Sequence, residues 1–155
     1  MHLRSRVRWT LAALVVAMLV LALRTHHHAS GEPDAAARLT LVATQFNHDY
    51  EVGNTGAVWD RYDARSRAII SRARDVRWHQ ECPTSPGTAT TTDVVHEPGG
   101  WWMVDYTIDG VMLHDYWHQE EGHWRFSLLR SNPASVALYS SNFQNFARAV
   151  GCSSA

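Results

Sequence analysis

The spacing of hydrophobic and polar positions changes once along this chain, near Pro83. Before that point, apolar residues recur every three or four positions. This period predicts amphipathic helices, one over about residues 35–50 and a second over about residues 57–78 with a bend near Asp63. Asp34 is a suitable N-cap for the first of these helices, because its side chain can accept a hydrogen bond from a free backbone amide.

After Pro83, apolar residues alternate with polar ones, as in strands that bury one face. Asp109-Gly110 is a strong signal for a two-residue hairpin turn, and Glu121-Gly122 predicts another tight turn. A last helix is expected where apolar residues share one face from Val136 to Val150. Between the helices, the pattern predicts four strands, over residues 88–95, 101–108, 111–119 and 124–129.

The two turns also predict which residues of an antiparallel meander share a face. The first turn places Val104 opposite Asp115 and Trp102 opposite Trp117. The second turn then places Asp115 opposite Leu128. One face of the sheet thereby gathers a long apolar set, made up of Trp102, Val104, Tyr106, Ile108, Val111, Leu113, Trp117, Trp124, Phe126 and Leu128.

The N-terminal segment combines basic residues with an apolar stretch. Three arginines precede fifteen uncharged residues, Trp9 to Leu23, and Arg24 follows them. Such a segment is recognised by the secretion machinery. A helix of fifteen residues spans roughly 22 Å, short of the ~30 Å hydrocarbon core, so two outcomes stay open. Residues 1–24 are either kept as a single-pass signal anchor, with a cytoplasmic N-terminus, or cleaved to give a secreted protein.

Composition describes the rest of the chain, in which residues 25–33 are expected to be a linker and residues 34–155 one extracytoplasmic domain. The sequence has 14 basic and 15 acidic residues, and all of the acidic ones follow Arg24. The exported part therefore carries a net charge of about −5, which argues against nucleic acid as a partner. No cofactor or metal is indicated, because the histidines lack a further ligand on a shared face.

Cys82 and Cys152 both lie in the part that is predicted to be exported. In an oxidising compartment an even pair most simply forms a disulfide, and two unpaired buried thiols are the alternative. A bridge would enclose about 70 residues, for which the chain-entropy model gives roughly 4 kcal/mol of stabilisation.

Asp115 does not fit the apolar face on which the register places it. A buried carboxylate has to be hydrogen-bonded, paired with a cation, or neutralised by a raised pKa. One interpretation is an acid or base in a pocket, with Tyr106 as its partner. The other is a structural carboxylate, held by an arginine from the helices or by the Tyr106 hydroxyl.

The opposite face of the sheet carries an apolar patch in an otherwise mixed surface. Its members, which form a candidate interface with a partner or a second copy, are Trp101, Met103, Tyr116 and His118. On the same face Asp105 is expected to lie opposite His114. This pair either orients an imidazole for proton transfer or is an ordinary surface pair.

Helices followed by a hairpin-rich sheet give the chain a resemblance to a known family. The residues that carry it are Val58 to Tyr62 leading into Ser66 to Ser71, together with Asp109-Gly110 and Glu121 to Phe126. Over roughly residues 34–129 the chain resembles the nuclear transport factor 2-like superfamily. The resemblance implies an α+β fold. In it a cone of helices packs on a bent antiparallel sheet of four or more strands, here with an N-terminal membrane helix and a C-terminal helix added.

This resemblance implies two different functions. Membrane-tethered bacterial members commonly serve as binding or assembly modules. The first expectation is therefore a non-enzymatic, membrane-tethered domain that binds a protein partner in the cell envelope or forms a homodimer, with a closed or shallow concave face. Members similar to ketosteroid isomerase instead use a pocket carboxylate with hydroxyl donors, and Asp115 and Tyr106 are the matching residues. The alternative is a pocket for a small apolar ligand, or an isomerase-like site, centred on Asp115.

Overall fold

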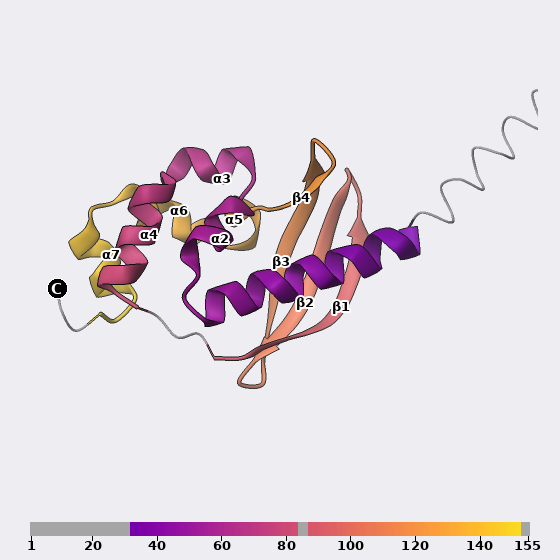
Figure 1. Ribbon diagram of the computed structural model, residues 1–155, viewed down its shortest axis with the longest axis horizontal. Coiled ribbons are helices and arrows are strands. Elements are labelled where there is room, and N and C mark those ends of the chain that lie inside the picture. Colours follow the sequence, from indigo (N-terminus) through magenta and orange to yellow (C-terminus); the bar gives the residue numbers. More distant parts are fainter. Residues whose placement is uncertain (1–31, 84–86, 153–155) are drawn as a thin grey trace, which may run out of the picture. The chain divides into compact units, whose positions relative to one another are not determined.

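The computed structural model describes residues 32–83 and 87–152. The chain divides into two compact units, residues 1–37 and 38–155, and the described part of the first unit, residues 32–37, is helical. In the second unit the described residues form an α+β domain of helices and one antiparallel sheet (Figure 1). The predicted membrane segment lies outside the described residues. None of the helices within those residues has the length and apolar character that crossing a bilayer requires.

The sheet is the predicted meander. Its described strands are hydrogen-bonded in the order β1-β2-β3-β4, and every neighbouring pair is antiparallel. Their bounds are β1 (Ala89–Glu97), β2 (Trp101–Ile108), β3 (Val111–Glu120) and β4 (His123–Phe126).

The predicted register between β2 and β3 is confirmed. A two-residue hairpin turn of type I′ requires positive φ at both of its central residues. Asp109 and Gly110 meet this requirement, with φ values of 50° and 80°. Val104 lies opposite Asp115, and Asp105 lies opposite His114. The second turn also holds, because Trp117 lies opposite Phe126.

The predicted end of the last strand is wrong. β4 stops at Phe126, and Leu128 begins a helical turn, α5 (Leu128–Ser131), so Leu128 does not lie opposite Asp115. The backbone amide of Leu128 donates a hydrogen bond of 2.9 Å to the hydroxyl of Ser66. Phe126 also makes backbone hydrogen bonds with Arg61 and Asp63. These contacts hold the chain against the helices, so it does not continue as a strand of the sheet.

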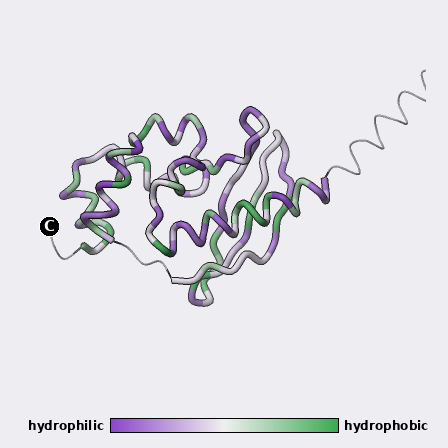
Figure 2. Tube along the Cα trace, in the orientation of Figure 1, coloured by the Kyte–Doolittle hydropathy of each residue, from purple (hydrophilic) through white to green (hydrophobic). Residues whose placement is uncertain are grey.

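The first helix is continuous over residues 32–51, so Asp34 lies within it and is not its N-cap. The expectation was wrong because the backbone is already helical at Glu32. In residues 38–51, apolar and polar positions alternate with the helical period (Figure 2). Leu39, Ala43 and Phe46 are buried. The ring of Phe46 lies 5.2 Å from that of Trp117, so this helix packs on the inner face of the sheet.

The second predicted helix consists of three shorter ones: α2 (Thr55–Asp60), α3 (Ala64–Ile69) and α4 (Arg72–Glu81). The expected bend near Asp63 is a full break. There the Asp63 side chain accepts a bond of 2.6 Å from the amide of Ser66 and caps α3. The further break at Ile70 was not predicted. Ile70 adopts an extended backbone that buries its β-branched side chain.

The predicted last helix is also divided, into α6 (Pro133–Ser140) and α7 (Phe143–Ala149), because Asn142 starts a new helix by capping the amide of Asn145. Phe146 from α7 packs 4.9 Å from the ring of Trp78 in α4. Next to this contact Cys82 and Cys152 form a disulfide, which confirms the predicted bridge. The bridge fixes the chain after α7 to the end of α4.

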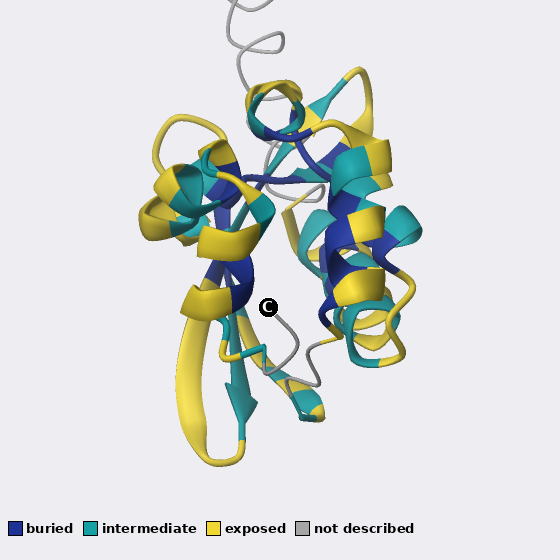
Figure 3. Cartoon of the chain, turned by 90° about the vertical axis from the view of Figure 1, so that its left-hand side faces the viewer, coloured by how far each residue is buried: buried dark blue, intermediate teal, exposed yellow. Residues whose placement is uncertain are grey.

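Burial is uneven along the inner face of the sheet. Trp102, Val104 and Trp117 are buried, whereas Val111 and Leu113 near the β2–β3 turn are 60% and 38% exposed. Figure 3 shows the same change along the sheet, from buried segments to exposed ones. The predicted apolar face is therefore correct in register, but only part of it is covered by helices. At the uncovered end the face borders a cavity.

Candidate functional site

A cavity of about 510 Å³ lies between the helices and the inner face of the sheet. It is lined by residues of the first helix, all four strands, α5, α6 and the segment from α2 to α3. Ligand pockets are commonly of ~300 Å³ or more, so the cavity is large enough for a compact organic molecule. The aromatic residues of the inner face do not fill it.

Asp115 lies in the wall of this cavity. The register of β3 turns its side chain to the inner face, where the residue is 7% exposed. Burial raises the pKa of Asp115 to about 7, against a smaller opposing effect of the Tyr106 hydroxyl and of His114. Among the described residues no arginine pairs with Asp115. Of the two partners expected for a structural carboxylate, an arginine from the helices or the Tyr106 hydroxyl, the hydroxyl is the one present.

Tyr106 is the polar neighbour of Asp115. Its hydroxyl donates a long hydrogen bond of 3.4 Å to Oδ1 of Asp115, and both residues line the cavity. Burial and the nearby Asp115 raise the pKa of Tyr106, which keeps the phenol protonated and able to donate. The structure thus brings together the two residues that the sequence singled out for an acid–base site.

A second polar cluster reaches the cavity and was missed from the sequence. The hydroxyl of Tyr139 lies 3.1 Å from Nε2 of His79, and that nitrogen is 3.7 Å from Oδ1 of Asp75. Tyr139 also acts on the pKa of Tyr62, and both tyrosines line the cavity. Asp75 and His79 are four residues apart on α4, a spacing that places both side chains on one helix face. This spacing is the feature of the sequence from which the cluster could have been predicted.

Burial controls the charges of this second cluster. It raises the pKa of Asp75 to about 7 and lowers the pKa of His79. Within the described residues neither carboxylate oxygen of Asp75 has a hydrogen-bond partner. Near neutral pH the imidazole is therefore uncharged, and the carboxyl group is close to its own titration point.

No family model and no curated protein sequence matches this chain. The described residues contain no group of three or more histidine, cysteine or acidic side chains placed to hold a metal ion.

The candidate interface on the other face of the sheet is partly covered. Trp101, Met103, Tyr116 and His118 are all half-buried. The guanidinium of Arg130 from α5 lies over the rings of Trp101 and Tyr116, at 4.8 Å and 4.6 Å, and is held there by Glu97 at 2.9 Å. This arrangement leaves less apolar surface for a partner than the sequence indicated.

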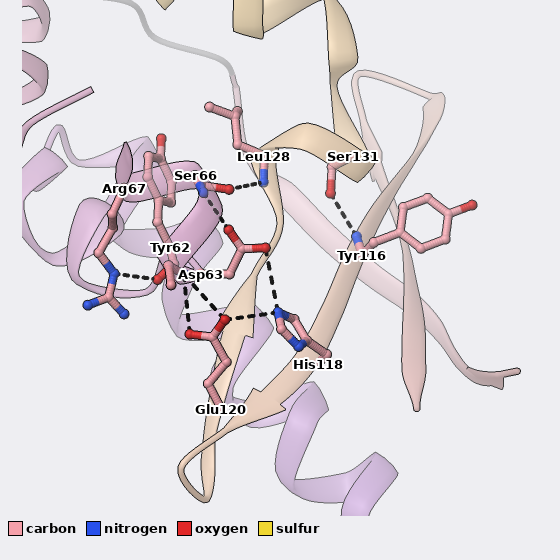
Figure 4. Close-up of polar contacts among 10 residues, drawn as sticks. Tyr62, Asp63, Ser66, Arg67, Tyr116, His118, Glu120, Leu128 and Ser131 are labelled. Atoms are coloured by element: carbon pink, nitrogen blue, oxygen red, sulfur yellow. Dashed lines mark hydrogen bonds and ion pairs between the residues drawn. The ribbon is translucent and has the colours of Figure 1, made fainter. Parts of the chain in front are cut away.

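His118 takes part in contacts within the domain. Its Nε2 lies 3.5 Å from Oδ2 of Asp63 and 3.5 Å from Oε1 of Glu120, while Glu120 also accepts from the amide of Ala64 (Figure 4). These contacts fasten β3 to the start of α3. The ring of His118 also lies 4.4 Å from that of Trp101.

The predicted cross-strand pair of Asp105 and His114 is present. Nδ1 of His114 and Oδ1 of Asp105 are 2.7 Å apart, and the His114 side chain is 49% exposed. His114 also contributes to the cavity wall. The pair is therefore a polar element at an accessible part of the cavity, on the strand that carries Asp115.

Proposed function

We propose that this domain binds a compact, largely apolar small molecule in the 510 Å³ cavity, and that a polar group of the molecule contacts Asp115. The observation that carries the proposal is the position of Asp115, a carboxyl group that is buried in the cavity wall without an arginine partner among the described residues. Burying such a group costs stability, and groups with strongly shifted pKa values cluster at functional sites.

The chemistry of the pair suits recognition of a polar group within an apolar pocket. A carboxyl group with a pKa of about 7 accepts or donates a hydrogen bond near neutral pH, and the Tyr106 hydroxyl beside it is a donor. The remaining wall supplies aromatic and aliphatic surface for the rest of the ligand. A few placed polar groups in a mainly apolar lining are typical of small-molecule sites.

Proton transfer on the bound molecule is a second candidate function, favoured by the same pKa. A base whose pKa is near the working pH is well matched to take a proton from a carbon next to a carbonyl and return it elsewhere. Tyr106 would meanwhile donate a hydrogen bond to the carbonyl oxygen. The resemblance to isomerase-like members of the nuclear transport factor 2-like superfamily supports this role, as does the order of helices and meander.

The disulfide supports a location outside the cytoplasm, because such bonds persist in oxidising compartments. In this proposal residues 1–24 form the signal anchor and hold the cavity outside the cell membrane, or are removed to give a secreted protein. Binding of a protein partner through Trp101 and Met103 stays a proposal of its own. It finds less support than the pocket, because Arg130 lies over part of that patch.

Binding is tested with the full chain in nanodiscs of neutral lipid and a small neutral probe, cyclohexylmethanol. Asn47→Trp fills the cavity from the first helix, and Gln45→Trp is the matched control, because Gln45 is exposed on that helix and does not line the cavity. Calorimetry should show saturable binding to the wild type and to Gln45→Trp, and at least about tenfold weaker binding to Asn47→Trp. Ser135→Trp, from the α6 side, should weaken binding in the same way. Equal binding to all four proteins would contradict the proposal.

A further inference from the structure

We infer that the ligand of this cavity is an organic cation, a compact apolar molecule that carries a protonated amine. The inference rests on the proposed function and names the class of molecule that the site selects. It is carried by the charges and the aromatic rings of the cavity wall.

The first observation is the sign of the charge in the wall. Asp115 is an acidic side chain of the lining, and none of the described residues that line the cavity is an arginine. The chain contains no lysine, so arginine is the only permanently charged cation that it offers. The one group of the lining able to become positive is His114, whose side chain is exposed and paired with Asp105. The wall therefore offers a negative charge that lacks a counter-charge.

The second observation is the aromatic character of the wall. Seven aromatic residues line the cavity: Phe46, Tyr50, Tyr62, Tyr106, Tyr116, Phe126 and Tyr139. Three of them are in contact on the sheet side, where the ring of Phe126 lies 4.8 Å from that of Phe46 and 5.7 Å from that of Tyr62. The faces of such rings attract cations, and the attraction increases where water is excluded.

The third observation is a second carboxyl group whose field reaches the same wall. Asp75 acts electrostatically on Tyr62 and Tyr139, raising the pKa of both phenols beyond the effect of burial. The potential at that side of the cavity is therefore also negative. Together with Asp115, which lines the cavity, the buried Asp75 behind the wall disfavours an anionic ligand, because no arginine of the described lining could bind it.

The burial of Asp115 also distinguishes a cation from a neutral ligand. An ammonium group gives the buried carboxylate the partner that the described protein residues do not supply, and an ion pair in a water-poor site is stronger than one at the surface. A neutral molecule gains only a hydrogen bond from the same group. The difference in affinity should be largest above pH ~7, where Asp115 is ionised, because burial sets its pKa at about 7.

The groups that face Asp115 determine how this pH dependence is read. They are Tyr106 from β2 and His114 from β3, and both oppose part of the effect of burial. Tyr50 from the first helix acts electrostatically on Tyr106. Protonation of Asp115 on acidification makes the wall less negative. Affinity for an ammonium ligand should therefore fall as the pH is lowered.

The test compares three probes of one shape in the nanodisc-bound full chain: cyclohexylmethylamine, cyclohexylmethanol and cyclohexanecarboxylate. At a pH of about 8, calorimetry should give at least about tenfold tighter binding of the amine than of the alcohol, and no binding of the carboxylate. Asp115→Asn should weaken binding of the amine at least about tenfold while changing the affinity for the alcohol by less than about threefold. The matched control Asp93→Asn removes an exposed carboxylate of β1 and should change neither.

A second measurement uses the wild type alone, so its result does not depend on whether Asp115→Asn folds. In the wild type, the affinity for the amine should fall by at least about tenfold between pH ~8 and pH ~5.5, while the affinity for the alcohol stays level. Equal affinities of amine and alcohol, with no change in Asp115→Asn, would overturn the inference and leave the proposed function standing. If none of the three probes binds, the proposed function fails together with the inference.

Discussion

The hydroxyl of Tyr106 lies 3.4 Å from Oδ1 of Asp115, where two neighbouring strands carry both side chains into the wall of one cavity. Their neighbours on the sheet are apolar: Val104 lies opposite Asp115, and Leu113 lies opposite Tyr106. The polar pair is therefore set into a hydrophobic surface, and it faces the helices that close the other side of the cavity. The first prediction concerns this pair.

Tyr106→Phe should raise the pKa of Asp115 above its value of about 7, because the Tyr106 hydroxyl stabilises the ionised carboxylate. The carboxyl ¹³C shift of selectively labelled aspartate, followed by NMR as a function of pH, reports this value directly. Tyr116→Phe is the control, because the ring of Tyr116 lies 4.6 Å from the guanidinium of Arg130 and its hydroxyl is not among the groups that shift the pKa of Asp115. An unchanged or lowered pKa in Tyr106→Phe would show that the hydroxyl does not act on Asp115.

Asp75→Asn should stabilise the domain at alkaline pH. Burial raises the pKa of Asp75 to about 7, so between pH ~4 and pH ~7 the folded state holds a proton that the unfolded chain has released. The contribution of Asp75 to the free energy of unfolding therefore decreases as the pH rises through this range. Asparagine does not titrate, so the variant lacks this pH dependence. The free energy of unfolding of Asp75→Asn should exceed that of the wild type by at least about 1 kcal/mol near pH 8, and the difference should shrink toward pH 4.

Urea denaturation of wild type and Asp75→Asn at several pH values measures this difference. Asp93→Asn, which replaces an exposed carboxylate, serves as the control and should show no alkaline advantage. A constant difference between Asp75→Asn and the wild type at every pH would mean that Asp75 titrates normally in the folded protein.

Replacing both cysteines, as Cys82→Ala with Cys152→Ala, should lower the free energy of unfolding by up to ~4 kcal/mol, because the bridge closes a loop of 70 residues. Denaturation with and without a reducing agent measures the effect. Reduction should destabilise the wild type and leave the double variant unchanged. Titration of two free thiols in the unreduced protein would show that the bridge does not form.

Asp63→Ala should destabilise the domain by roughly 1–2 kcal/mol, because the buried Asp63 side chain caps α3 through the amide of Ser66 and also faces His118. Asn54→Ala is the comparison variant, since Asn54 occupies the N-cap position of α2 without a side-chain cap bond. Thermal unfolding compares the two. A smaller loss for Asp63→Ala than for Asn54→Ala would contradict the assigned role of Asp63.

The sheet was largely predictable from the sequence, because each of its turns contains a residue type that favours positive φ. Gly110 and Gly122 fix two hairpins, and the period of two then decides which residues share a face. The same period predicts that Asp115 and Tyr106 lie on one face of the sheet, as they do. It failed where the strand ended, because the hydrogen bond from Leu128 to Ser66 joins segments more than sixty residues apart.

The helical side of the cavity was less predictable. Helical periodicity continued through Ile70 and Ser141, and the breaks there depend on local caps and on burial of Ile70. The polar cluster around Tyr139 was not found, because Tyr139 meets His79 only when α6 packs on α4. Cavity volume likewise depends on how closely two layers approach, and no sequence period encodes that separation.

The most direct test of the account is a crystal structure of the protein with cyclohexylmethylamine bound. The account predicts that the ring occupies the cavity between Phe46 and Tyr139 and that the amine nitrogen lies within about 3 Å of a carboxylate oxygen of Asp115. An empty cavity in crystals soaked at saturating amine, or a ligand whose nitrogen points away from Asp115, would contradict it.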